Sequence, residues 1–194
     1  MGRFKPLLAW PTADSATTLV DYVVSQLLEA SVDDLVVVVG SCAPEVSDRI
    51  APMGVRTVLN PNYASGKASS VRTGMAALGK DVTAIAVLGV DQPRPSWLLR
   101  RLFAAHLGSS APVTVPVFQG RWGHPPVFDA ALRDQLAAVQ EETQGLRPVV
   151  RGQYPNVQEV DVGSRIALVN LNEPEDYDEA QRIFALAVDD RGSA

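Results

Sequence analysis

Two uninterrupted apolar runs stand out in the pattern of hydrophobic and polar positions, at residues 34–40 and 82–89. Both runs are rich in β-branched residues and stop at a glycine, as strands buried on both faces of a parallel sheet do. Such strands need helices above and below them, and four segments repeat apolar side chains at helical spacing. The helices expected from this periodicity cover residues 18–30, 69–78, 96–107 and 174–188.

Three shorter apolar runs predict further strands, at residues 55–59, 113–118 and 157–162. Pro116 places the second of these near an edge of the sheet, because proline has no N–H to donate. Alternating strands and helices predict an α/β fold with a doubly wound, mostly parallel, Rossmann-like sheet and helices on both faces. We expect one domain over residues 1–188 and a flexible tail over 189–194.

Composition and charge restrict the function of this chain of 194 residues. Its 17 Lys and Arg against 22 Asp and Glu give a formal net charge of -5, with no basic run, so extended nucleic acid is not an expected partner. No apolar run approaches the roughly 20 residues that span a bilayer, and the N-terminus lacks a secretory signal. Cys42 is the single cysteine and has no internal disulfide partner. We therefore expect a cytoplasmic protein with no membrane association.

Asp91 is the strongest candidate for chemistry, because it follows the run 82–89 and precedes a proline. Ligands of open α/β sheets bind beyond the carboxyl ends of the strands, where this carboxylate should lie. A carboxylate there can hold Mg²⁺ against triphosphate oxygens. The alternative is that Asp91 caps the helix near Ser96 or closes a turn.

A second set of oxygen ligands lies near the C-terminus, at Asn170 and Asn172. If this segment is the end of a strand, alternation puts both amides on one face, where their oxygens suit Mg²⁺. Glu175 and Asp176 follow Pro174 at the start of a helix, so we interpret these acids as compensating the helix dipole.

Three other segments carry weaker signals. Lys5 comes three residues after Gly2 and can act as a point charge on phosphates. The segment 60–74 leaves a strand, passes a glycine and begins a helix, whose N–H groups favour an anion or a base edge unless serine caps them. His124 and Arg121 lie in one turn and could face an acceptor substrate, although a lone histidine is more often structural.

Taken together, these segments resemble the MobA/MocA-like NTP transferases, which attach GMP or CMP to molybdopterin cofactors. The segments that carry the resemblance are residues 1–8, 60–70, 89–93, 123–128 and 170–176. Within 89–93, which resembles the family's metal-binding aspartate motif, Val90 is an extra residue before Asp91. The segment 123–128 is similar to the cytidylyltransferase side of the family. The resemblance places Met1 after the family's first strand and part of its glycine-rich loop, and that strand is expected in the middle of the sheet.

The resemblance implies a transfer of a nucleoside monophosphate from an NTP, CTP slightly ahead of GTP, to a phosphorylated acceptor such as a molybdopterin cofactor. It implies Mg²⁺ held by Asp91, Asn170 and Asn172. Catalytic roles are implied for Lys5, Asp91 and His124. The residues implied to bind the nucleotide are Gly2, Lys5, Asn60, Gly66, Ser69 and Ser70. The alternatives are a noncatalytic nucleotide-binding relative and a sugar-phosphate nucleotidyltransferase.

Overall fold

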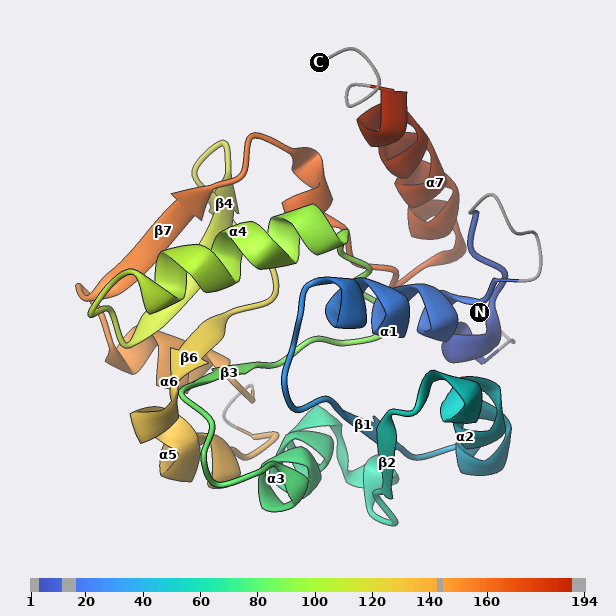
Figure 1. The fold of residues 1–194 in the computed structure, drawn as a ribbon, viewed down its shortest axis with the longest axis horizontal. Helices are drawn as coiled ribbons and strands as arrows, with labels where there is room; N and C mark the ends of the chain where they lie inside the picture. The colour runs from blue at the N-terminus through green and yellow to red at the C-terminus, as the bar shows by residue number, and fades with distance from the viewer. Residues whose placement is uncertain (1–3, 12–16, 143–144, 190–194) are drawn as a thin grey trace.

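The computed structural model of the chain describes residues 4–11, 17–142 and 145–189, and it has the expected α/β class (Figure 1). The α-helices are α1 (Leu19–Glu29), α2 (Ala43–Ile50), α3 (Lys67–Ala77), α4 (Ser96–Leu107), α5 (Arg133–Ala137), α6 (Arg147–Gly152) and α7 (Pro174–Asp189). The strands are β1 (Val36–Val39), β2 (Arg56–Leu59), β3 (Ala84–Ala86), β4 (Val113–Phe118), β5 (Arg121–Trp122), β6 (Val127–Asp129) and β7 (Val157–Asp161). Short 3-10 helices are η1 (Lys5–Leu7), η2 (Ala51–Met53), η3 (Tyr63–Ser65), η4 (Ala130–Leu132) and η5 (Arg165–Leu168).

The strands form two separate hydrogen-bonded ladders in the described part of the chain. One is the parallel pair β1–β2, and the other has the order β3-β6-β4-β5 with β7 on the far side of β4. The longest pairing of the second ladder, β4 with β7, is parallel. The expected parallel pairing of the run 82–89 is wrong, because only Ala84–Ala86 is a strand there and it pairs antiparallel with β6. β1 and β3 therefore each keep one unpaired edge among the described residues.

Pro116 lies inside the second ladder, so its expected place near an edge is wrong. β4 pairs with β6 at Val113 and Thr114 and with β5 from Val117 onward, while β7 pairs along its other side. Pro116 falls in the interval between the two antiparallel partners. Its missing N–H therefore removes no bond of either antiparallel ladder, which is how an interior strand accommodates it.

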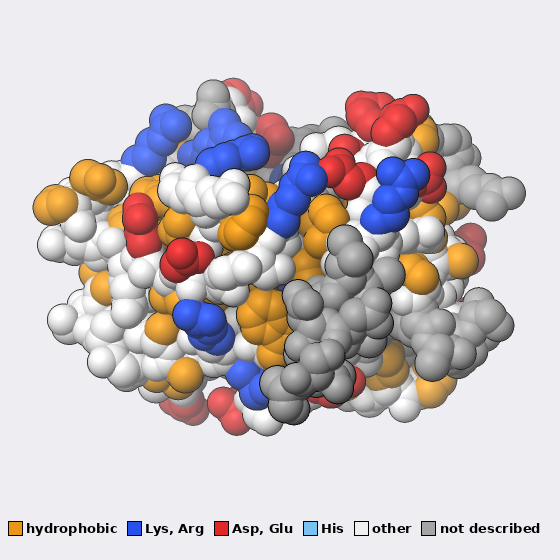
Figure 2. Space-filling view, turned by 90° about the horizontal axis from the view of Figure 1, so that it is seen from above, with side chains coloured by type: hydrophobic (Ala, Val, Ile, Leu, Met, Phe, Trp, Pro, Cys, Tyr) orange, Lys and Arg blue, Asp and Glu red, His pale blue; other side chains and the backbone are white. Residues whose placement is uncertain are grey.

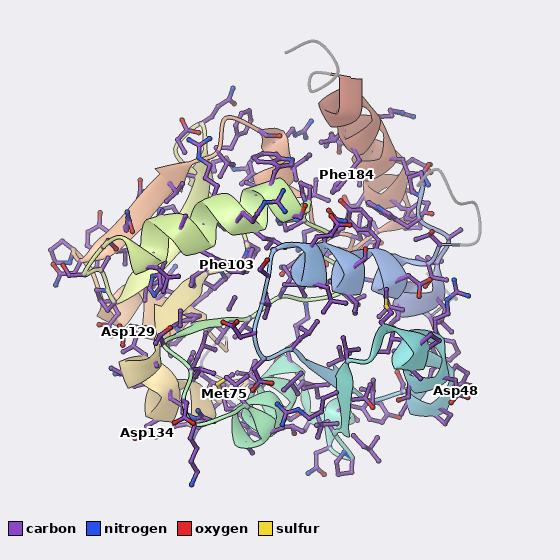
Figure 3. All side chains as sticks on the ribbon, viewed as in Figure 1. Asp48, Met75, Phe103, Asp129, Asp134 and Phe184 are labelled. Carbon is purple, nitrogen blue, oxygen red and sulfur yellow. The ribbon has the colours of Figure 1, made fainter. Side chains whose placement is uncertain are left out.

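Helices cover both faces of the second ladder, as the apolar runs predict. Val127 and Phe128 are adjacent on β6, both are fully buried, and they belong to different core clusters because neighbouring strand residues point to opposite faces. The first cluster holds buried residues of α1, α4 and α7, including Phe184, with Phe103 packed against it. The second joins α3, through Met75, to α5 and α6 (Figure 3).

The N-terminal part of α1 is tied to the C-terminal helix by aromatic contacts. Trp10 is 2% exposed, and its ring centroid lies 5.1 Å from that of Phe184 and 5.7 Å from that of Tyr22. Asp21 accepts a hydrogen bond from the Thr18 N–H at 2.8 Å, which satisfies a free donor at the start of α1. Through Trp10, these contacts pack the N-terminal segment that carries Lys5 against α1 and α7.

The surface agrees with the low basic charge of the sequence. On the face drawn in Figure 2, basic side chains lie in separate groups with acidic side chains between them. Within the described ranges, none of the helices combines the length and apolar character needed to cross a bilayer.

Candidate functional site

Three irregular segments meet beyond the ends of the strands, and each carries a residue singled out by the sequence. They follow β3, β5 and η5 and carry Asp91, His124 and Asn170. The Leu171 N–H donates to the Asp91 carbonyl at 2.8 Å, and the Lys5 ammonium donates to the Leu171 carbonyl at 2.6 Å. Leu171 therefore joins the segment that carries Asn170 to the segment that carries Asp91, and it also holds Lys5 beside them.

Asp91 is 7% exposed, and its Oδ2 lies 3.1 Å from Nζ of Lys67. A Cβ at Gly89 would lie 2.3 Å from Oδ1 of Asp91, so only glycine leaves room for the carboxylate in this position. The Ser96 N–H at the start of α4 donates to the Gln26 side chain instead of to Asp91. The carboxylate is thus paired with Lys67, and the Ser96 N–H at the start of α4 has another acceptor.

The two asparagines of the last segment differ, and the expected strand at Asn170 and Asn172 is wrong. After η5 the chain is irregular up to α7, so strict alternation does not apply. Oδ1 of Asn170 is buried and has no hydrogen-bond partner, whereas Asn172 is exposed. Asp176 accepts the N–H groups of Asn172 and Glu173, both at 2.8 Å, which supports the interpretation of this acid as helix-start chemistry.

The oxygen atoms at this place suit a hard divalent cation. A buried carbonyl oxygen without a donor costs free energy, typically about 1–3 kcal/mol, unless a cation or another donor satisfies it. Asn170 provides such an oxygen, and Asp91 provides a carboxylate on the segment bonded to it. Among the described residues no group of three His, Cys, Asp or Glu side chains could hold a metal, so a metal held here would need amide or backbone oxygens beside the carboxylate.

The loop from β2 to α3 reaches the same place through Lys67. Asn60, at the start of this loop, is bonded both within the loop and to α3. The Asn60 amide donates to the hydroxyls of Ser69 and Ser70 at 2.8 Å and 3.0 Å, and Oδ1 of Asn60 accepts the Asn62 N–H. Asn60 and Ser69 are buried. These contacts give the loop a fixed shape in front of α3.

A carboxylate already lies at the start of α3. Glu141 accepts a hydrogen bond from the Ala68 N–H at 2.8 Å, and a Cβ at Gly66 would lie 2.4–2.6 Å from the atoms of the Glu141 side chain. Gly66 has a φ of 102°, which L side chains rarely adopt. The Ala68 N–H at this helix start is therefore already bonded to an anionic group, and that group is a side chain of the protein.

His124 is exposed to solvent, and hydrogen bonds hold its backbone in place. Its N–H donates to the Ala167 carbonyl at 3.1 Å, and its carbonyl accepts from Nε of Arg94 at 2.8 Å. Desolvation of the imidazole by neighbouring protein atoms, followed by the nearby charge of Arg94, lowers the pKa of His124 to about 4, against the opposing influence of Asp91. The imidazole is thus neutral at neutral pH. Arg121, on β5, is exposed.

The structure brings Lys5, Asp91 and Asn170 together and places the loop around Asn60, Gly66, Ser69 and Ser70 beside them through Lys67. Gly2 lies outside the described residues. Sequence reasoning missed Lys67, Arg94 and Glu141. Lys67 directly follows Gly66 in a loop already singled out, so its place gave a usable signal. Arg94 and Glu141 gave none, because arginine and glutamate are usually solvated.

A family model described as the MobA-like NTP transferase domain matches residues 1–160. The chain belongs to this family. The MobA-like domain also resembles solved structures along nearly its whole length. The mycobacterial protein Rv0371c of Mycobacterium tuberculosis is 24% identical with a TM-score of 0.77, over 94% of this chain and 90% of that chain. A manganese complex of the same protein is 23% identical with a TM-score of 0.75, over 93% of each chain.

A nucleotidyl transferase from Methanothermobacter thermautotrophicus is 27% identical to this MobA-like domain. Its TM-score is 0.74, over 94% of this chain and 86% of that chain. No match was found among curated proteins. The comparisons confirm the α/β nucleotidyltransferase fold and the family expected from the motifs.

Proposed function

We propose that this MobA-like domain transfers a nucleoside monophosphate from an NTP to a phosphorylated acceptor, with Mg²⁺ bound at Asp91 and Asn170. The observation that carries the proposal is the buried Asn170 Oδ1 without a donor, on the segment that Leu171 bonds to Asp91. Asn172 would complete the ligand set from its exposed position. The manganese complex of Rv0371c supports a divalent cation in this fold.

The reaction is an in-line attack of an acceptor phosphate oxygen on the α-phosphorus of the NTP. One P–O bond forms to the acceptor and one breaks to the β-phosphate, which leaves as pyrophosphate. A divalent cation bound here would offset the negative charge that develops on the phosphoryl oxygens. No covalent nucleophile is required, because positioning and charge stabilisation supply most of the catalysis.

The cations of the chain have distinct places in this scheme. Lys5 is bonded to Leu171, Lys67 is paired with Asp91, and both supply positive charge to the triphosphate, which a chain of net charge -5 otherwise repels. His124 is neutral at neutral pH, so it acts toward the acceptor as a hydrogen-bonding group and not as a cation. Arg121, on the neighbouring strand β5, can supply charge to the acceptor phosphate.

We propose CTP ahead of GTP as the nucleotide, on the similarity of the segment around His124 to the cytidylyltransferase side of the family. A molybdopterin cofactor is the proposed acceptor, and a sugar phosphate is the alternative. The NTP pool is cytoplasmic, so we place the reaction there.

The test is pyrophosphate release by the purified full chain with Mg²⁺, each NTP and each acceptor, together with Mn²⁺ binding followed by electron paramagnetic resonance. Asn170→Ala should weaken Mn²⁺ binding by at least about tenfold, as loss of a ligand does. Asn156→Ala, an exposed amide before β7, is the matched control and should bind as the wild type does.

Equal NTP affinity with and without a chelator would contradict the metal site. Nucleotide binding without pyrophosphate release from any acceptor would favour the noncatalytic alternative.

A further inference from the structure

Arg94 is the most completely buried charged side chain of the described residues, with 0% of its surface exposed. All three guanidinium nitrogens donate to backbone carbonyls. Nε donates to His124 at 2.8 Å, Nη1 to Pro93 at 2.7 Å, and Nη2 to both Ala167 and Val169 at 2.9 Å. One side chain therefore satisfies four carbonyl groups.

These acceptors belong to the three segments of the candidate site. Pro93 follows Asp91 by two residues, and Val169 directly precedes Asn170. The third acceptor is the carbonyl of His124 itself. The Ala167 carbonyl accepts from both Arg94 and the His124 N–H, and a Cβ at Gly123 would lie 2.1 Å from this oxygen. The segments consequently meet at a junction with no room for an added methyl group.

Arginine suits this junction because its planar fork presents five N–H donors at fixed angles, which lysine cannot reproduce. A buried guanidinium loses its hydration, which lowers the pKa of Arg94 to about 9, while the nearby charge of Asp91 favours the protonated form. The side chain thus remains cationic at neutral pH. Being fully buried, it does not itself reach a substrate.

We propose that Arg94 is a positioning residue that holds the acceptor-facing His124 in register with the cation-holding residues Asp91 and Asn170. The inference rests on the proposed function. It adds the residue that fixes the acceptor-facing segment of His124 relative to the segments of Asp91 and Asn170. Arg94 acts through the backbone of three segments, so a change at Arg94 alters the relative placement of groups that it does not touch.

Arg133 offers a matched control. It donates to the carbonyls of Met75, Leu78 and Gly79 at the end of α3, so it makes the same kind of multiple carbonyl contact away from the site. If Arg94 had only a structural role, substitutions of the two arginines would differ only in their effect on stability. Their effects on metal binding and on the site would be the same.

The experiment compares the full-length wild type with Arg94→Lys and Arg133→Lys, using Mn²⁺ alone as the probe. Electron paramagnetic resonance gives the Mn²⁺ affinity, and proton NMR follows paramagnetic broadening of the His124 ring. His106, bonded to Thr114 at the other end of β4, is the internal reference. kcat and KM for the Mg²⁺–CTP complex are measured on the same proteins.

Arg94→Lys should weaken Mn²⁺ binding at least about tenfold, the usual scale for residues that orient metal ligands. It should also reduce the selective broadening of His124 and lower kcat more than it raises KM. Arg133→Lys should leave all three readouts within about twofold of the wild type. Unchanged Mn²⁺ affinity and broadening in Arg94→Lys, or equal losses in Arg133→Lys, would overturn the proposal.

Two further results remain decisive. If Arg94→Lys does not fold, Gly123→Ala is used instead, because it displaces the segment of His124 while the Arg94 guanidinium is retained. Unchanged Mn²⁺ affinity in Gly123→Ala would overturn the proposal. If the wild type binds no Mn²⁺, the proposed function fails separately. In that case the His124 ring resonances are compared between metal-free Arg94→Lys and metal-free wild type. Identical resonances would reject a positioning role for Arg94.

Discussion

Nζ of Lys67 lies 3.1 Å from Oδ2 of Asp91, so the candidate metal-binding carboxylate already has a cationic partner. The Lys67 side chain is 79% exposed and that of Asp91 is 10% exposed, which makes the lysine the partner that can leave. A divalent cation at Asp91 must compete with this ammonium group.

Lys67→Met should therefore raise the Mn²⁺ affinity of the nucleotide-free protein. An exposed ion pair contributes at most about 1 kcal/mol, so the expected gain is no more than about fivefold. Titration followed by electron paramagnetic resonance measures it. Lys80→Met, which removes an exposed lysine beyond the other end of α3, should have no effect. Weaker Mn²⁺ binding in Lys67→Met would mean that the lysine assists the cation and does not compete with it.

Asp91→Asn should abolish nucleotidyl transfer and Mn²⁺ binding while leaving the fold intact. The hydrogen bond from the Leu171 N–H uses the backbone carbonyl of Asp91, which asparagine retains. The carboxylate itself pairs with a largely exposed lysine, so the free energy of unfolding should change by no more than about 1 kcal/mol. Urea unfolding followed by circular dichroism checks this. A large loss of stability would instead support the capping role of Asp91.

Acid should destabilise the protein between about pH 6.5 and pH 4 through its histidines. The pKa of His124 is lowered to about 4, and burial lowers the pKa of His106 as well. Below about pH 6.5 the unfolded chain binds protons that the folded chain does not, so the free energy of unfolding falls as the pH falls. Urea unfolding at several pH values should show this slope, and His124→Gln should flatten it. A slope identical in the variant would show that His124 titrates normally in the folded protein.

Removing Glu141 should strengthen nucleotide binding, because its carboxylate occupies the helix start that the sequence pattern suggests for an anion. Charges at a helix N-terminus typically contribute about 0.3–1 kcal/mol, so Glu141→Ala should improve the affinity for the Mg²⁺–CTP complex by up to about fivefold. Isothermal titration calorimetry measures this. Glu142→Ala removes the same charge from the next residue and is the control. Equal effects of both variants would indicate general electrostatics.

The sequence predicted the parts of the fold that depend on local periodicity and proline chemistry. The helix at 96–107 coincides with α4, and the strand at 55–59 includes β2. Pairing was harder, because β3 finds an antiparallel partner only when the chain returns as β6 more than 40 residues later. A turn motif cannot reveal such a long-range choice.

The candidate site divides in the same way. Asp91 was recognisable because it follows a strand-like apolar run, at the edge where open α/β sheets bind ligands. Arg94, three residues later, was not, because its four acceptors are backbone carbonyls from distant segments and carbonyls carry no sequence signature. Asn170 and Asn172 were expected on one face of a strand, but the backbone after η5 is irregular: Oδ1 of Asn170 is buried, whereas Asn172 is exposed.

The unpaired edges of β1 and β3 predict that an added strand will stabilise the protein. An extension before Met1 with a Leu-Ala-Ala-Gly-type strand and loop should pair with one or both edges, at about 0.5–1.5 kcal/mol per backbone hydrogen bond. Because 1 kcal/mol corresponds to about 2–4 °C for a domain of this size, the melting temperature should rise by at least about 5 °C. A polar extension of equal length is the control. No gain over this control would show that the edges do not accept a strand.

The division of the sheet also bears on how the protein moves. The β1–β2 ladder leads into the loop that carries Asn60 and Lys67, whereas Asp91 follows the other ladder. No strand hydrogen bonds join the two ladders in the described residues, and the contacts between their segments include the Lys67–Asp91 pair and the bond from the Ala68 N–H to Glu141. Segments joined in this way open as independent units more readily than those within one continuous ladder. Amide hydrogens of β1 and β2 should thus exchange with solvent faster than those of β4. The space for a triphosphate between Lys67 and Asp91 should change as the two ladders move.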